Sequence, residues 1–344
     1  MNKGKQQIIG IASILLLLVG CSAHGLSDEE VATLSSLEQV DDYPLYSMHY
    51  YGAYNQRVSS AEGVKWLVGA NLPNPNLMAL PPAWACSLLA ALGETDNMFY
   101  GRNFDWKYSP AVLLFTDPPD GYASVSMVDI AYLGFGRTKV GTLTDLPLIA
   151  RRALLNTPFM PFDGMNEHGL VVGMAAVPGS EMPYERGKAT IDSLMVIRKM
   201  LDHAHDVDEA VAILQSYNIR WDGGPPLHYL IADSSGHSVL VEFYEGEMVI
   251  ILNERPWHLA TNHLRTIADD TGPSGCWRYD KIYQQLTEAE GQVATQEAID
   301  LLAQVSESRT QWSIIYGMST GDVNVTMGRK YDNVHAFHLS LADE

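Results

Sequence analysis

One of the three cysteines of this chain, Cys86, lies where a proline-rich stretch gives way to an apolar run. The run at residues 86–92 is typical of a buried strand, and Arg102 and Asp105 follow it closely. A thiol attacks as the thiolate, which a nearby cation stabilises, and a base must accept its proton. If Cys86 were the first residue of a processed chain, its own α-amine could be that base. Asp105 could then hold the amine and Arg102 the thiolate.

The beginning of the chain has the features of an export signal followed by a lipidation site. A basic start precedes an apolar run at residues 8–19, which is too short to span a bilayer comfortably and ends in Gly20-Cys21. This resembles a bacterial lipobox, in which cleavage after Gly20 leaves Cys21 to be lipidated. An ordinary signal peptide that ends at a chance cysteine is the alternative. We expect residues 1–21 to be a lipoprotein signal peptide, and a lipid on Cys21 to anchor the protein in the bacterial cell envelope, with its folded body outside the cytoplasm.

The charge of the chain restricts its partners. The sequence has 22 basic and 41 acidic residues, and its formal net charge is −19. Such an acidic surface argues against nucleic acid or an anionic membrane surface as a partner. No Cys-x-x-Cys or His-Glu-x-x-His pattern occurs, so the sequence predicts neither a metal site nor a cofactor.

The remaining two cysteines leave an alternative open. In an oxidising compartment Cys86 and Cys276 could form a disulfide. The protein would then be a non-catalytic lipoprotein that binds an extracellular ligand.

The order of apolar patterns predicts strands, then helices, then strands, rather than a βαβ alternation. Residues 22–35 are polar and predict a tether, and residues 36–85 are rich in aromatics and close with a loop. The helix-period patterns lie around Leu194–Leu201, around Ala210–Tyr217, and at residues 276–287 and 295–305, the last capped by Thr295. Strand-like runs lie at residues 86–92, 111–116, 122–132, 170–177, 227–232, 238–243, 248–252, 312–318, 322–327 and 334–339.

Several blocks, in this order, resemble the choloylglycine hydrolase group of N-terminal-nucleophile hydrolases. That group includes bile salt hydrolases, penicillin V acylases and, more distantly, acid ceramidase and isopenicillin N acyltransferase. The matching blocks are Cys86 with Gly101-Arg102-Asn103-Phe104-Asp105, Gly164-Met165-Asn166-Glu167-His168-Gly169-Leu170, Leu227 to Asp233 with Val241-Glu242, Thr261-Asn262, and Arg278. The resemblance covers about residues 86–330 and implies an α+β fold, a four-layer αββα sandwich with Cys86 on an inner strand.

The resemblance also implies a role for each matched residue. Cleavage of the Ala85–Cys86 bond would make Cys86 the nucleophile. An α-amine titrates near pH ~8 and a thiol near ~8.5, so proton transfer between them is nearly balanced. Arg102 and Arg278 would favour the thiolate electrostatically. The side-chain amide of Asn262 would donate to the oxyanion.

The chain departs from the bile salt hydrolases in two places. They carry an asparagine where this chain has Ala176, whose backbone N–H could still complete the oxyanion hole. They also begin almost at the nucleophile. The long leader at residues 22–85 is more like the acyltransferase and ceramidase branch, so it could stay bound as a small subunit beside the hydrolase domain at residues 86–344.

The sequence therefore predicts an enzyme that hydrolyses a linear, non-peptide C–N amide through a thioester on Cys86. Its partner would be a small N-acyl amide, and an oligomer is compatible with the sequence. Acyl transfer to another amine would use the same residues, and the sequence does not distinguish the two reactions.

Overall fold

The computed structural model describes residues 25–54, 85–136, 142–221, 224–268 and 274–342. The α-helices are α1 (Asp28–Ser35), α3 (Met195–His203), α4 (Val207–Ser216), α5 (Trp277–Glu288) and α6 (Thr295–Gln304). The 3₁₀ helices are Thr95–Asn97, Ile130–Leu133, Leu143–Asp145 and Leu148–Phe159. The strands are β1 (Glu38–Asp41), β2 (Leu45–Tyr50), β3 (Ser87–Ala91), β4 (Phe99–Asp105), β5 (Ala111–Thr116), β6 (Ser124–Asp129), β7 (Asp163–Asn166), β8 (Val171–Ala176), β9 (Thr190–Asp192), β10 (Asn218–Arg220), β11 (Leu227–Ala232), β12 (Ser238–Tyr244), β13 (Glu247–Leu252), β14 (Trp257–Ala260), β15 (Thr310–Gly317), β16 (Asp322–Met327) and β17 (His335–His338).

Two large sheets pack face to face and form the centre of the fold. One has the order β1-β2-β5-β6-β7-β8-β11-β12-β13, and the other has the order β14-β3-β4-β15-β16-β17. Strands β3 and β4 are buried along their whole length. Burial on both faces explains why the sequence of β3 is a nearly continuous apolar run, whereas β4 also buries the charged side chains of Arg102 and Asp105. Apart from β9 and β10, which pair with each other, all the described strands belong to these two sheets.

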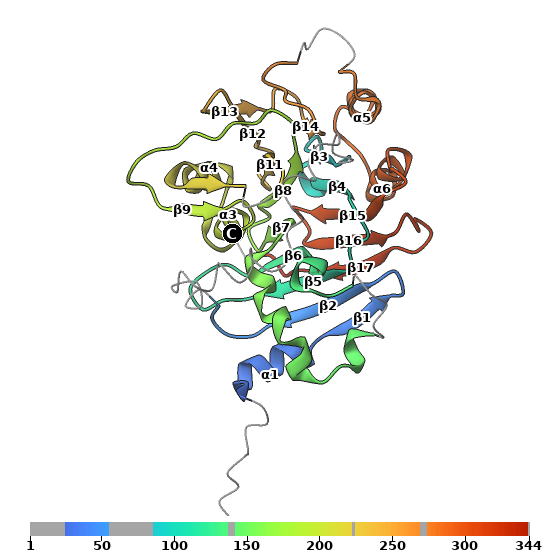
Figure 1. The fold of residues 1–344 in the computed structure, drawn as a ribbon. Helices are drawn as coiled ribbons and strands as arrows, with labels where there is room; N and C mark the ends of the chain where they lie inside the picture. Colours follow the sequence, from blue (N-terminus) through green and yellow to red (C-terminus); the bar gives the residue numbers. More distant parts are fainter. Residues whose placement is uncertain (1–24, 55–84, 137–141, 222–223, 269–273, 343–344) are drawn as a thin grey trace, which may run out of the picture.

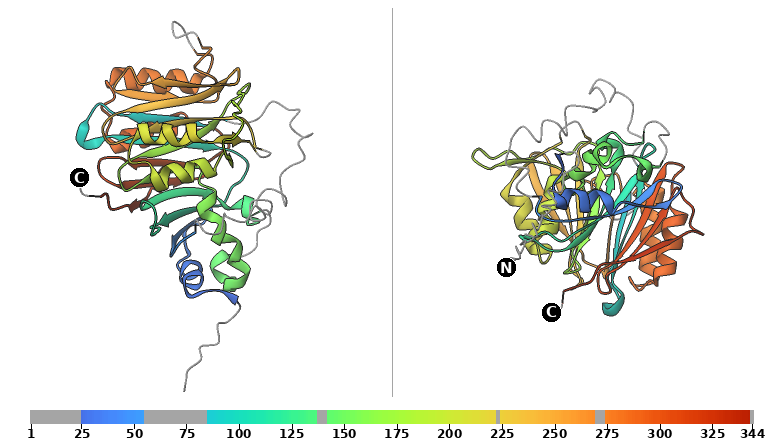
Figure 2. Two further views of the ribbon diagram at one scale, coloured as in Figure 1. Left: turned by 90° about the vertical axis from the view of Figure 1, so that its left-hand side faces the viewer. Right: turned by 90° about the horizontal axis from the view of Figure 1, so that it is seen from below.

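Helices cover the outer face of each sheet. The pair α3 and α4 packs on the first sheet through β7, β8 and β11, and the pair α5 and α6 packs on the second through β3, β4, β14 and β15. The view from below shows the yellow pair and the orange pair on opposite sides of the sheets (Figure 2). On α3 the buried side includes Val196, Ile197, Met200 and Leu201, a spacing that places them on one helical face. The αββα sandwich expected from the sequence is confirmed.

The segment before Cys86 is an integral part of this fold rather than only a tether. Residues 28–35 form helix α1, which begins at a capping box between Ser27 and Glu30, so the expectation of a polar tether at residues 22–35 is wrong there. Strand β2 pairs in parallel with β5 and thereby joins the leader to the larger sheet (Figure 1). The side chains of Leu34, Leu45 and Met48 are fully buried.

Two other sequence expectations need correction. The strand expected at residues 122–132 is shorter, because Ile130–Leu133 is a 3₁₀ helix, in which the backbone N–H of Ala131 donates to the side chain of Asp129. The N-cap of α6 is Ala294 rather than Thr295, and Glu297 accepts a hydrogen bond from the backbone N–H of Ala294.

The expected signal peptide at residues 1–21 and the lipidation site at Cys21 lie outside the described residues, as do residues 55–84 of the leader. Among the helices that are described, none combines the length and the hydropathy that crossing a bilayer would require.

The burial of Met48 predicts that the leader contributes directly to stability. Met48→Ala should lower the free energy of unfolding by about 2–5 kcal/mol, because it leaves a cavity in a fully buried position of β2. Glu38→Ala, at an exposed position of β1, should change it by less than about 0.5 kcal/mol. Urea unfolding of both variants measures the difference. Equal stabilities would contradict the placement of β2 in the core.

Candidate active site

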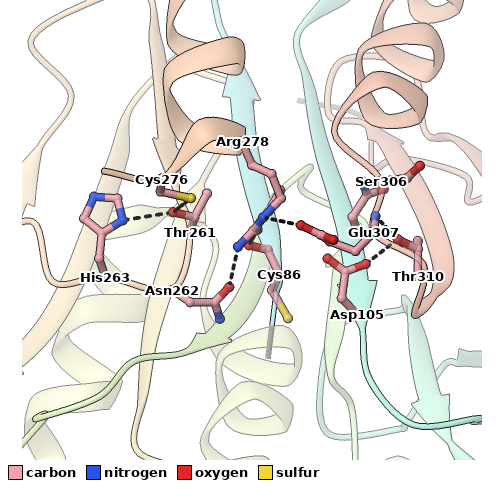
Figure 3. Close-up of polar contacts among 12 residues, drawn as sticks. Cys86, Asp105, Thr261, Asn262, His263, Cys276, Arg278, Ser306, Glu307 and Thr310 are labelled. Carbon is pink, nitrogen blue, oxygen red and sulfur yellow. Dashed lines mark hydrogen bonds and ion pairs between the residues drawn. The ribbon is translucent and has the colours of Figure 1, made fainter. Parts of the chain in front are cut away.

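The pairing of β3 with both of its neighbours brings the predicted residues together around Cys86. Cys86 directly precedes β3, whose first residue, Ser87, lies opposite Asn103 of β4. On the other side Leu88 lies opposite Ala260, the last residue of β14. The residues that end β4 and those that follow β14 therefore lie level with Cys86, and Figure 3 shows Asp105 and Asn262 on either side of it.

Arg102 is the cation closest to the thiol among the described contacts. Its Nη2 lies 4.0 Å from Sγ of Cys86, and its side chain is fully buried. Burial raises the pKa of the Cys86 thiol, whereas the charge of Arg102 and its hydrogen bond lower it. The guanidinium is held from the opposite sheet, because Nη1 donates to Oδ2 of Asp163 at 2.6 Å and to the carbonyl oxygen of Phe162 at 2.5 Å. Tyr316 donates to the other oxygen of Asp163 at 2.5 Å.

Asp105 has one carboxylate oxygen satisfied and one without a partner. The hydroxyl of Thr310 donates to Oδ1, while the buried Oδ2 has no hydrogen-bond partner. Burial raises the pKa of Asp105 to about 7, although the hydrogen bond from Thr310 and the charge of Arg278 oppose this shift. A buried, unpaired carboxylate oxygen beside Cys86 is suited to accept a hydrogen bond from a charged amine there.

Asn262 and Ala176 are also brought together. The side-chain amide of Asn262 donates to the carbonyl oxygen of Ala176 at 2.7 Å. This contact uses the carbonyl of Ala176, so the expected donation by the Ala176 N–H to an oxyanion stays a prediction.

Arg278 contacts the backbone beside the thiol rather than the sulfur. Its Nη1 donates to the carbonyl oxygen of Cys86 and, at 3.1 Å, to the hydroxyl of Ser87. Its Nη2 donates to Oδ1 of Asn262 at 3.2 Å, and Nε lies 3.5 Å from Glu307. These contacts suit Arg278 to orient Asn262 and the backbone of Cys86 more than to stabilise the thiolate.

The second cysteine lies close to this site but is not bonded to Cys86. Both Cys86 and Cys276 are free thiols. The hydroxyl of Thr261 lies 3.4 Å from Sγ of Cys276. Burial would raise the pKa of Cys276, but hydrogen bonds with His263 and Thr261 outweigh it and lower the pKa to about 6. The ligand-binding alternative that depends on a disulfide therefore has no support here.

Sequence reasoning missed the residues that support the site from a distance along the chain. These are Asp163 and Tyr316, which hold Arg102, and Thr310 and Glu307, which contact Asp105 and Arg278. Only Asp163 had a signal, since it directly precedes the Gly164-Met165-Asn166 block. In that block Asn166 shapes a turn, as its side chain accepts hydrogen bonds from the backbone N–H groups of His168 and Leu170. No group of three or more His, Cys, Asp or Glu side chains in the described part of the chain is arranged to hold a metal ion.

Comparison with known proteins gives matches of sequence and of fold. Residues 156–320 match the model of the family described as acyl-coenzyme A:6-aminopenicillanic acid acyl-transferase. A penicillin V acylase from Pectobacterium atrosepticum is 30% identical over 124 residues, which is 33% of this chain and 32% of that protein. The match therefore spans about a third of the length of this curated relative.

Two solved structures share the fold at low sequence identity. A variant of the conjugated bile acid hydrolase from Clostridium perfringens has a TM-score of 0.53 and 16% identity, with 74% of this chain and 92% of that chain covered. The penicillin V acylase from Agrobacterium tumefaciens has a TM-score of 0.51 and 17% identity, with 74% of this chain and 86% of that chain covered. The match over residues 156–320 and the similar penicillin V acylase confirm the resemblance to the penicillin acyltransferase and acylase family. The two solved structures, a bile acid hydrolase and a penicillin V acylase, show the same fold as this chain.

Proposed function

We propose that this protein is an amide hydrolase in which Cys86, as the N-terminal residue of a processed chain, carries the acyl group as a thioester. The observation that carries this proposal is the buried oxygen of Asp105, which has no partner and lies beside Cys86. A free α-amine on Cys86 would supply the missing donor. No separate histidine base is then needed.

The reaction follows from the groups around the thiol. The α-amine of Cys86 accepts the thiol proton, and the thiolate attacks the amide carbon of the substrate. The resulting oxyanion accepts hydrogen bonds from Asn262. The C–N bond breaks as the α-ammonium returns its proton to the leaving amine. Water then attacks the thioester, the α-amine accepts a proton from that water, and the acid and the free thiol are released.

Processing must precede this reaction, because the Ala85–Cys86 peptide bond occupies the α-nitrogen. Ala85 is partly exposed, whereas Cys86 is buried, and the bond directly precedes β3. We propose autoproteolysis at this bond. The Asp105 carboxyl, whose pKa burial raises to about 7 in the intact chain, would become a carboxylate paired with the new ammonium group.

The part of the leader before the cut would remain with the enzyme. Residues 25–54 supply β1 and β2 to the larger sheet, and Tyr54 donates to the buried carboxylate of Asp202 on α3 at 2.6 Å. Removal of this segment would expose Leu34, Leu45 and Met48 to water. A cut at Cys86 would therefore give two chains held together without a covalent bond, and a lipid on Cys21 would anchor the pair through the smaller one.

An acyltransferase is the second candidate, and the family name matched by residues 156–320 favours it. The two reactions share the acylation step and differ in whether water or an amine takes the acyl group. A panel of N-acyl amides, penicillin V, bile salt conjugates and acyl homoserine lactones tests for hydrolysis. The same panel with an added amine acceptor tests for transfer. Absence of turnover with every amide would contradict both candidates.

Processing gives the first test of the nucleophile. Intact-mass measurement of the purified protein should show a chain that begins at Cys86. Cys86→Ala should remain uncut and inactive, because it lacks the thiol that attacks the preceding carbonyl group. Cys276→Ala should be processed normally, because the Cys276 thiol lies at the start of α5, where it contacts Thr261, and not at the cut. Full activity of a protein whose 85–86 bond is intact would contradict the mechanism.

Alkylation separates the roles of Arg102 and Asn262. The charge of Arg102 lowers the pKa of the Cys86 thiol, so Arg102→Gln should raise it and shift iodoacetamide alkylation to higher pH by about one unit. Asn262→Ala should leave the alkylation profile unchanged, because it removes an oxyanion donor, while amide turnover falls by about 10²–10³-fold. The measurement is best made with Cys276→Ala as the background, since Cys276 also has a low pKa.

The exposed Arg152 offers a matched control, and Arg152→Gln should alter neither alkylation nor turnover. If Arg102→Gln alkylates with the wild-type pH profile, Arg102 does not set the stability of the thiolate.

A further inference from the structure

Glu242 is a fully buried carboxylate to which the proposed mechanism assigns no step. It lies on β12, within the block that resembles the family, and both of its oxygens are occupied. Oε1 accepts a hydrogen bond from the backbone N–H of Arg265 at 2.8 Å and contacts Nδ1 of His228 at 3.1 Å. Oε2 accepts from the backbone N–H of Thr266 at 2.8 Å and from its hydroxyl at 2.7 Å.

These four contacts need an ionised carboxylate. A carboxylate only accepts, so the hydrogen of the contact with His228 is on Nδ1. Burial would raise the pKa of Glu242, but the hydrogen bonds from His228, Thr266 and Arg265 outweigh it and lower the pKa to about 2. A glutamine cannot replace this set of contacts, because its amide nitrogen would donate toward groups that also donate.

The segment that Glu242 binds is the one that carries Asn262. It leaves β14 after Ala260, and Thr261 and Asn262 follow directly. Asn262 is tied at its own position by Ala176 and Arg278. Glu242 ties the same segment a few residues later, so the segment is held at Asn262 and again at residues 265 and 266.

The two ties end on β8 and β12, two strands of one sheet that lie on either side of β11. His228 of β11 contacts Glu242 and lies opposite Ala175 of β8, and Ala176 is the next residue. Asn262 and Glu242 thus join the segment after β14 in the smaller sheet to β8, β11 and β12 in the larger sheet. A shift of the segment would displace the Asn262 amide relative to Cys86, which is fixed at the start of β3.

We propose that Glu242 is a positioning residue for the oxyanion donor: it holds residues 261–266 so that the amide of Asn262 faces the tetrahedral intermediate. The inference rests on the proposed function, since it assigns Glu242 to the same site. It differs from a purely structural role, which would lower stability without a specific link to Asn262.

A double-mutant cycle in amide turnover tests the proposal. Glu242→Gln should lower kcat by roughly tenfold or more, with KM changed by less than about twofold, because Asn262 acts on the transition state. The double variant Glu242→Gln/Asn262→Ala should be no slower than Asn262→Ala alone. Iodoacetamide alkylation of Cys86 should be unchanged in all three variants. Glu247→Gln, on an exposed position of β13, is the matched control and should retain wild-type kcat.

Hydrogen exchange provides a readout that does not depend on turnover. Glu242→Gln should speed exchange of the Arg265 and Thr266 amides while leaving β3 and β4 protected. If Glu242→Gln does not fold, Thr266→Val removes a single donor to Oε2 and should give the same kcat effect at smaller size.

The outcomes separate the inference from the function on which it rests. No turnover of any amide by the wild type would refute the proposed function, and exchange would still decide whether Glu242 holds the segment. Three results would overturn the positioning role. In the first, the double variant loses kcat by the product of the two single losses. In the second, Glu242→Gln lowers Cys86 alkylation as much as it lowers kcat, and in the third the exchange of the amides of residues 265 and 266 is unchanged.

Discussion

The buried ion pair between Arg102 and Asp163 is the interaction on which the rest of the site depends. Both side chains are fully buried and lie on different sheets, so the pair fixes β4 against β7 through the centre of the sandwich. Loss of one member would leave an uncompensated buried charge, which would lower the free energy of unfolding by roughly 3–5 kcal/mol. A buried ion pair is by itself weak evidence for stability. The same guanidinium also contacts Sγ of Cys86 through Nη2, so the pair fixes the position of the cation beside the thiol.

The charges around the thiol divide into two groups with different tasks. Arg102 acts on the sulfur, and Asp163 prevents it from turning away. On the other side, Arg278 binds the carbonyl oxygen of Cys86 and the side chain of Asn262, and Glu307 lies near its Nε. In the proposed mechanism, nucleophile activation and oxyanion binding would therefore depend on separate networks. For this reason we expect substitutions to change alkylation and turnover independently.

The sequence indicated the parts of the site that lie close together along the chain or in recognisable blocks. Cys86, Arg102 and Asp105 belong to the paired strands β3 and β4, of which only the apolar β3 was predicted from the sequence. Asp163 and Glu242 stood in or beside matching blocks, but their partners lie on other strands, and such pairing depends on the register between and across sheets. Thr310 follows α6 and meets Asp105 only because β15 pairs with β4.

The structure of the leader, in contrast, was not predicted correctly from the sequence. Ser27 and Glu30 carried a capping signal for α1, yet the polar composition of residues 22–35 outweighed it, and the sequence favoured a tether. Parallel pairing of β2 with β5 could not be read from either strand alone, since partner choice between distant strands leaves no local pattern.

In the proposed mechanism Cys86 carries the acyl group while its own α-amine is free. The most direct test is mass spectrometry of the protein mixed with an amide that it turns over and then quenched in acid. We predict a proteolytic peptide that begins at Cys86, without Ala85, and that carries a single acyl group. An acyl group on another residue, or an acylated Cys86 still joined to Ala85, would contradict the account.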